Sequence, residues 1–194
     1  MRRILDAAGE LFDRWSYQDI SIQRIADATG LAKGTVYLYF ATKEQLFLSL
    51  FDSQAEEWFG ALQYHLDEHD GPTTAAETGT MITATLCARP TLIRLFALRH
   101  RCLDGDIRPE AATAHLREHD RRTNNLAISL TNHADISIDQ AKRWIQRTDA
   151  IISGLAQQAR PDTTNGGNHR LDFESELRHI ATILLEQEMK RAEA

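Results

Sequence analysis

A short run near the start of the chain combines side chains that bind phosphate with side chains that read bases. Residues Gly30 to Lys43 read GLAKGTVYLYFATK. Lysine ammonium groups bind phosphate oxygens, and a threonine offers both a hydroxyl and a methyl group to base edges. Gly34 has no side chain, so the backbone there can approach a phosphate closely. The run therefore predicts contact with double-stranded DNA.

Two short helices must hold this run in place. Ser21 offers a capping oxygen at the start of the first helix, and Gly30 is a natural left-handed stop at its end. The second helix is expected from about Lys33 to Phe40, with Val36 and Phe40 one turn apart on its buried side. A tight turn between two such helices is typical of a helix-turn-helix, whose second helix enters the major groove.

The other side of the second helix is expected to be exposed and polar. Lys33 and Tyr37 lie one turn apart and therefore share this side. Tyr39 and Lys43 extend the polar surface toward backbone phosphates. Ser21 lies at a helix N-terminus, which is a natural position for an anion.

The run Gly30 to Lys43 resembles the recognition segment of the TetR family of repressors, and Ile4 to Phe51 as a whole is similar to that family's N-terminal domain. The resemblance implies that DNA is contacted by Ser21, Lys33, Gly34, Thr35, Tyr37, Tyr39 and Lys43. Two positions depart from the family pattern. Ala32 stands where the family usually has a capping serine, and Ser16 replaces the common glycine before Tyr17.

Two other interpretations of this run stay open. The tyrosines and Thr35 can simply pack against a helix or solvate it. Alternatively, the chain can be a helical protein-interaction module whose helix-turn-helix no longer binds DNA. The crowding of two tyrosines and two lysines into so short a stretch favours DNA binding.

Two histidine motifs could in principle hold a metal. His65 to His69 and His115 to His119 both match the H-x-x-E-H pattern of some zinc peptidases, in which two histidines one turn apart grip zinc. Catalysis also needs a third ligand and a cleft, and chance matches are expected in a chain with eight histidines. We therefore expect each motif on a solvated helix face and assign no metal. A metal-sensing regulator is the alternative that stays open.

The net charge of -6 argues at first against a nucleic-acid partner. The first 48 residues, however, carry six basic and six acidic side chains and are neutral overall. All of the excess acidity lies downstream. The charge therefore does not oppose DNA binding by the N-terminal segment.

The rest of the chain shows helical periodicity and no convincing strand. A fourth helix is expected from Thr42, which heads a Thr-x-x-Gln capping box with Gln45. Further helices are expected at about 75–88, 90–103, 110–132, 138–159 and 171–191, with a loop from Asp162 to Asn168 that we expect to be mobile. The predicted fold is all-α, with an N-terminal three-helix helix-turn-helix domain (1–48) followed by a larger helical ligand-binding and dimerisation domain (49–194).

The same resemblance implies two sites in the larger domain. The effector pocket of the family lies among the middle helices, which here contribute Met81, Leu86, Ile93, Phe96 and His100. The family dimerises through a four-helix interface of its last two helices, which here contribute Trp144, Thr148, Ile151, Ile152, Leu155, Phe173, Leu177, Ile180 and Leu184. Packing within one chain is the alternative for the residues of both sets.

The expected function is that of a repressor released from a palindromic operator when a small-molecule effector binds the larger domain. A homodimer is expected because one short helix reads few bases, so two must reach successive major grooves about 34–36 Å apart. No Gly-rich phosphate loop after a strand, Gly-x-Ser-x-Gly or Cys-x-x-Cys motif is present, so we expect neither an enzyme nor a cofactor.

The sequence also favours a cytoplasmic protein with no membrane partner. No stretch approaches the length of a membrane span, and the first residues mix charged with apolar side chains, unlike a secretory signal. The two cysteines, Cys87 and Cys102, are too few for a disulfide framework.

Overall fold

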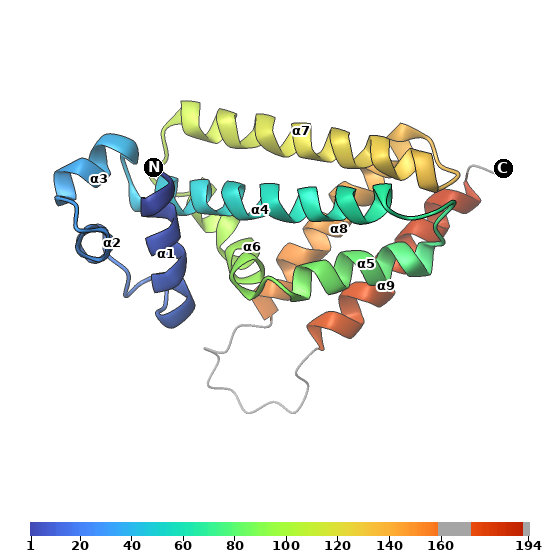
Figure 1. Ribbon diagram of the computed structural model, residues 1–194, viewed down its shortest axis with the longest axis horizontal. Coiled ribbons are helices and arrows are strands. Elements are labelled where there is room, and N and C mark those ends of the chain that lie inside the picture. The colour runs from blue at the N-terminus through green and yellow to red at the C-terminus, as the bar shows by residue number, and fades with distance from the viewer. Residues whose placement is uncertain (159–171, 192–194) are drawn as a thin grey trace.

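The computed structural model describes residues 1–158 and 172–191, which form helices and, within those ranges, no strand (Figure 1). The helices are α1 (Arg2–Arg14), α2 (Ile22–Thr29), α3 (Lys33–Tyr39), α4 (Lys43–Asp67), α5 (Ala75–Cys87), α6 (Pro90–Leu103), α7 (Pro109–His133), α8 (Ile138–Gln158) and α9 (Phe173–Lys190). The predicted all-α class is confirmed. The loop from Asp162 to Asn168 lies outside the described residues.

Helices α1 to α3 form a small bundle at one end of α4 (Figure 1). The apolar face of α1 buries Ile4 and Phe12, and α1 packs against both α2 and α4. Apolar residues from Ile4 to Trp15 recur at spacings of three and four, which predicts that Trp15 lies on the same face. This prediction is wrong. Helix α1 ends one residue earlier, and the Trp15 side chain is 46% exposed, with the guanidinium of Arg24 4.3 Å from its ring centroid.

The start of α4 forms only part of the expected capping box. The Thr42 hydroxyl accepts a hydrogen bond from the Gln45 backbone N–H at 3.1 Å. The Gln45 side chain, however, accepts from the backbone N–H of Ala41 at 3.2 Å rather than from that of Thr42. A complete capping box occurs instead at the start of α5, between Thr74 and Glu77.

Helix α4 runs from the N-terminal bundle to the opposite end of the molecule, with α7 alongside it (Figure 1). Helix α8 packs against α6, α7 and α9, while α5 packs against α9. The fully buried Trp144 fastens α8 to α9, because its indole N–H donates to the Ala181 carbonyl oxygen at 2.9 Å. In the larger domain, α6 and α7 thus both pack against α4, and α8 packs against α6 and α7.

The apolar stretches of the described helices are short. No single helix among them has both the length and the apolar character to span a membrane. The pair α5 and α6 meets the criterion jointly by length and composition, with a bend of 91° between the two helices. Both helices bury apolar side chains in the protein core, among them Leu86, Leu92 and Phe96.

Gly79 permits the close approach of α5 and α9. A Cβ atom at this position would lie 2.3 Å from the Thr182 hydroxyl oxygen and 3.3 Å from the Arg178 carbonyl oxygen. We expect Gly79→Ala to lower the free energy of unfolding by about 1–3 kcal/mol, because overpacking outweighs the better helix propensity of alanine. Urea denaturation at fixed protein concentration measures the change.

Gly60→Ala is the matched control, because a Cβ atom at this exposed position of α4 meets nothing within 4 Å. It should raise the free energy of unfolding by about 0.5–1 kcal/mol. Equal effects of the two substitutions would contradict the close approach at Gly79.

Candidate functional site

Helix α3 presents one buried side and one polar exposed side. Val36 is fully buried and Phe40 nearly so, as their spacing predicts. Lys33 and Tyr37 share the exposed side, and the Lys33 ammonium lies 5.9 Å from the centroid of the Tyr37 ring. Tyr39 is also exposed. The side of α3 that faces away from the protein therefore carries a lysine and two tyrosines within two turns.

The turn before α3 sets the angle at which this surface is presented. Gly30 has a left-handed backbone (φ 64°), and the Leu31 N–H returns to the Ala26 carbonyl oxygen at 2.9 Å. The Ser21 hydroxyl caps α2 by accepting from the Arg24 backbone N–H at 3.1 Å. Ala32 precedes α3 and has no side-chain cap to offer. Ser21, Lys33 and Gly34 are thus exposed at the surface, and Thr35 is half-buried.

The Lys43 side chain is held by contacts within the protein. Its ammonium donates to the Tyr17 carbonyl oxygen and lies 3.9 Å from the centroid of the Tyr17 ring. Burial lowers the pKa of Lys43, and the nearby Arg101 lowers it further. The Tyr17 hydroxyl in turn donates to Glu44 at 2.8 Å. This cluster joins the loop before α2 to the start of α4.

Leu38 is an exposed residue that the sequence analysis did not single out. It lies on α3 between Tyr37 and Tyr39, and its side chain is 86% exposed. The burial of Val36 and Phe40 was the available signal, because it leaves the intervening residues outside. An apolar side chain here can contact a thymine methyl group in a major groove.

Helix α6 connects the larger domain to the N-terminal bundle. The Arg94 guanidinium donates to the Phe12 carbonyl oxygen, and to the Trp15 carbonyl oxygen at 3.0 Å. The neighbouring Thr91 hydroxyl donates to the Asp13 carboxylate at 2.5 Å. These contacts satisfy carbonyl groups at the end of α1 and join that helix to α6.

The five predicted effector-pocket residues do not line one cavity. Leu86 and Phe96 are buried in the core, and Ile93 is half-buried. Met81 borders an apolar void of about 10 Å³ between α4, α5, α7 and α8. His100 is exposed and borders a separate, open depression of about 630 Å³, whose other lining residues are Glu44, Ala97, Arg101, Asp104, Gly105 and Gln157.

The predicted dimer residues divide into two groups. Four are buried within the single chain, namely Trp144, Thr148, Ile152 and Leu177. The others stay half-buried: Ile151, Leu155, Phe173, Ile180 and Leu184. Exposed Gly154 of α8 and Ile183 of α9, which is 38% exposed, adjoin this second group. The half-buried residues leave apolar area that a second subunit can cover.

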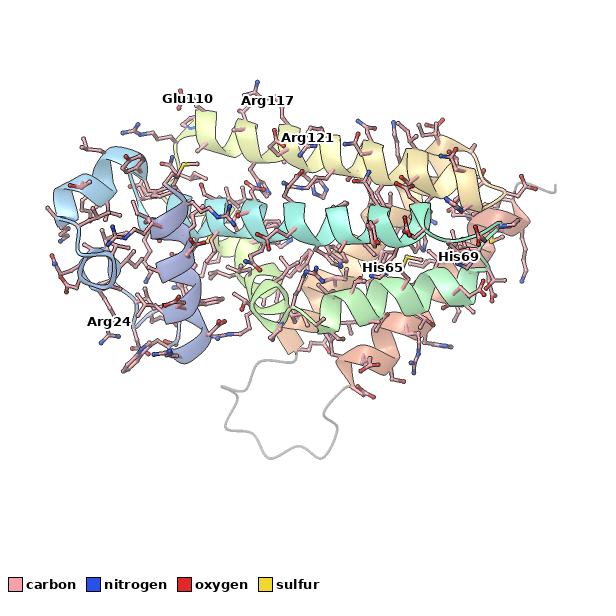
Figure 2. All side chains as sticks on the ribbon, in the orientation of Figure 1. Arg24, His65, His69, Glu110, Arg117 and Arg121 are labelled. Carbon is pink, nitrogen blue, oxygen red and sulfur yellow. The ribbon has the colours of Figure 1, made fainter. Side chains whose placement is uncertain are left out.

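Neither histidine motif lies wholly on the solvated helix face that the sequence predicts. His65 lies in the last turn of α4 and His69 lies beyond its end, so the pair does not share a helix face (Figure 2). His115 is buried rather than solvated, which makes the prediction of an exposed face wrong for it. The Glu118 carboxylate pairs at 2.8 Å with Arg121 on the exposed face of α7. Within the described ranges, no group of three or more His, Cys, Asp or Glu side chains is arranged to hold a metal ion.

His115 belongs to a buried polar network that the sequence analysis missed. Its Nδ1 lies 2.8 Å from the Asp52 carboxylate of α4, which also accepts from Arg122 at 2.8 Å. A second ion pair joins α6 to α8, since Arg99 donates twice to Asp149, at 2.9 and 2.5 Å. These pairs come from residues far apart in the sequence, and no local spacing announces them.

Comparison with known proteins agrees with the fold. Residues 4–50 match the model of bacterial regulatory proteins of the tetR family, and residues 52–186 match the tetracyclin repressor-like C-terminal domain. The fatty acid metabolism regulator protein of Bacillus subtilis (strain 168) is 33% identical over 66 residues. That match covers 34% of this chain and 34% of that protein, about a third of each.

Two solved structures share the fold over nearly their whole length. The fatty acid degradation regulator FadR from Bacillus halodurans has a TM-score of 0.59 and 18% identity, over 95% of this chain and 97% of that chain. FadR from Bacillus subtilis, solved in complex with stearoyl-CoA, has a TM-score of 0.56 and 20% identity, over 97% of both chains. The two family models together span most of the sequence, and the chain belongs to the tetR family of bacterial regulatory proteins.

Proposed function

We propose that this protein is a dimeric repressor that binds a palindromic operator and leaves it when a small molecule binds the larger domain. The observation that carries the proposal is the exposed side of α3, where Lys33, Tyr37 and Tyr39 project from a helix held by a glycine turn. Such a helix fits the major groove, where lysine binds phosphate or guanine and aromatic edges contact bases and sugars. A repressor of this kind acts on the chromosome, so we place it in the cytoplasm and assign it no enzymatic role.

The proposed DNA contacts have distinct roles. The base edges are contacted by Lys33, Thr35 and Tyr37. Gly34 allows the DNA backbone to approach closely, and the Tyr39 hydroxyl donates to a phosphate. Ser21 presents the N-terminus of α2 to a second phosphate. The Lys43 ammonium has three N–H donors, one of which donates a hydrogen bond to the Tyr17 carbonyl oxygen. The remaining protons are available to a phosphate beside α4.

The proposed dimer joins α8 and α9 of two subunits in a four-helix interface. Supporting it are the half-buried Leu155, Ile180 and Leu184, together with Gly154, whose lack of a side chain allows helices to approach closely. Trp144, Thr148, Ile152 and Leu177 are assigned instead to the core of each subunit.

The proposed effector acts through α4 and α6, which lead into the N-terminal bundle. An effector that prefers a conformation with displaced recognition helices weakens DNA binding by the same factor by which DNA weakens effector binding. Two of the matches are named as fatty acid regulators, and the FadR structure from Bacillus subtilis was solved with stearoyl-CoA. This makes compounds with an apolar chain the first class to test.

Selection of bound duplexes from a random pool tests the function. We expect enrichment of a palindrome whose half-site centres lie about one helical turn apart, or a multiple of it, because each subunit presents one α3. Tyr37→Ala should lose this enrichment. Tyr64→Ala is the control, because Tyr64 is also exposed but lies near the far end of α4. Failure of the unmodified protein to enrich any palindrome would defeat the proposal.

Lys43→Ala tests the phosphate contact beside α4. The slope of log affinity against log salt concentration should fall in magnitude by about one unit, as expected for one lost phosphate contact. Fluorescence anisotropy with the selected operator at several salt concentrations measures this slope. Lys190→Ala, at the exposed end of α9, should leave it unchanged. An unaltered slope in Lys43→Ala would remove Lys43 from the DNA surface.

Ala32→Ser tests the missing cap of α3. The extended backbone of Ala32 (φ -67°, ψ 144°) already suits an N-cap residue, so a serine hydroxyl can accept from the exposed N–H groups of the first turn. We expect the free energy of unfolding to rise by about 0.5–1 kcal/mol in urea denaturation. Ala32→Val carries no oxygen and should give no such gain. A serine variant no more stable than the valine variant would show that α3 is already capped in another way.

A further inference from the structure

Three buried polar atoms on α7 and α8 have no hydrogen-bond partner among the residues that the structure describes. They are Nε of Arg122, Oγ1 of Thr123 and Oγ1 of Thr148. The three residues are only 3%, 5% and 2% exposed. A buried donor left without a partner loses its hydrogen bonds to water without replacement, so its presence in a packed core calls for an explanation.

These atoms belong to residues at one end of an apolar region. Arg122 and Thr123 lie one turn from Leu126 on α7, and Thr148 lies one turn from Trp144 on α8. Leu126 and Trp144 border the void of about 10 Å³, whose other lining residues are Leu62, Leu66, Thr78, Met81, Ile82 and Leu130. Polar groups that can donate therefore lie one helical turn from residues that line a small apolar void between four helices.

The charges nearby favour an oxygen acceptor over a cation. Two buried guanidinium groups lie in this part of the core. Arg99 is paired with Asp149. Arg122 is paired with Asp52 and lies 3.8 Å from the Glu56 carboxylate. Burial lowers the pKa of His119, and the positive charge of both arginines lowers it further although Asp149 raises it. A carboxylate or carbonyl oxygen can accept from Nε and from the hydroxyls, whereas an ammonium group would be repelled by the arginines.

We propose that this region binds an amphiphile whose apolar chain enters the void and whose carboxylate or thioester carbonyl accepts hydrogen bonds from Arg122, Thr123 and Thr148. The inference rests on the proposed effector-responsive function and names the class of its ligand. From Arg122 to Leu130 helix α7 rises about 12 Å, the extent of a medium-length acyl chain. The void itself is much smaller, so the chain enters by displacing side chains. Half-buried Met81 is unbranched and moves most readily.

The same arginine connects the ligand to the DNA-binding end. Its terminal nitrogens hold the Asp52 carboxylate and backbone carbonyl of α4, at 2.8 and 3.4 Å. An acceptor on Nε draws the rigid guanidinium plane toward α8 and away from Asp52. Because α4 continues into the N-terminal bundle, weakening this pair frees α4 to shift against α7.

Isothermal titration calorimetry on the full chain without DNA tests the ligand class. The probes are dodecanoate, dodecanoyl-CoA and dodecylammonium. We expect dodecanoate or dodecanoyl-CoA to bind at least tenfold more tightly than dodecylammonium. Preference for the acid identifies a free carboxylate as the head group, and preference for the thioester identifies a carbonyl. No binding of either, or equal binding of all three, overturns the proposal.

Isosteric variants separate a ligand contact from a structural role. Thr123→Val and Thr148→Val should each weaken binding of the preferred probe about tenfold, because one hydrogen bond to it is lost. The same variants should be at least as stable as the unmodified protein in urea, because an unpartnered hydroxyl is removed. Thr113→Val, on the exposed face of α7, should change neither quantity.

Two further outcomes decide against the inference. Unchanged affinity in both valine variants would show that internal water satisfies the hydroxyls. A loss of stability in both would show that they hold the fold together. Either result leaves the DNA-binding proposal intact, since enrichment of a palindrome is measured without any ligand.

Discussion

Helix α4 has to be buried along its length in one continuous hydrophobic core. Its first turns contribute Leu46 and Phe47 to the part of that core inside the N-terminal bundle, where the Phe47 ring packs edge-on against Phe12 and Tyr17. Its later turns contribute Trp58 and Leu62 to the part inside the larger domain. Because the helix is continuous between the two parts, it cannot be repositioned in one without disturbing the other.

One set of interior polar pairs lies on α4, between these two parts of the core. Asp52 is roughly in the middle of α4 and holds His115 and Arg122 of α7. Replacing such a pair with apolar side chains often costs no stability, so pairs of this kind are better suited to fixing one register of packing. Asp52 pairs α4 with α7, while the rings of Trp58 and Phe96 pack α4 against α6. Polar pairing and apolar packing on α4 thus involve different residues.

Local patterns in the sequence predict the turn and the buried side of α3 well and the interior of the larger domain poorly. Gly30, Val36 and Phe40 act through contacts within a few residues, so spacing alone identifies the turn and the buried side of α3. Arg122 and Asp52 meet across 70 positions, and nothing nearby in the sequence shows that they will pair.

Helical periodicity also identifies an apolar stripe without saying what covers it. Trp144 and Leu177 are covered by their own chain, whereas Leu155 and Leu184 on the same two helices stay half-buried. That distinction depends on how α8 and α9 are rotated against each other, which is a property of the folded chain. The Trp15 side chain is a similar case, because its exposure depends on the residue at which α1 ends.

The junction between α1 and α6 can be altered separately from the polar side of α3. Arg94 and Thr91 contact the end of α1 through polar groups, in addition to the apolar contacts that Phe47 of α4 makes with the bundle. Neither residue belongs to α3. Substitution at these two positions therefore disturbs the junction without changing any side chain of α3.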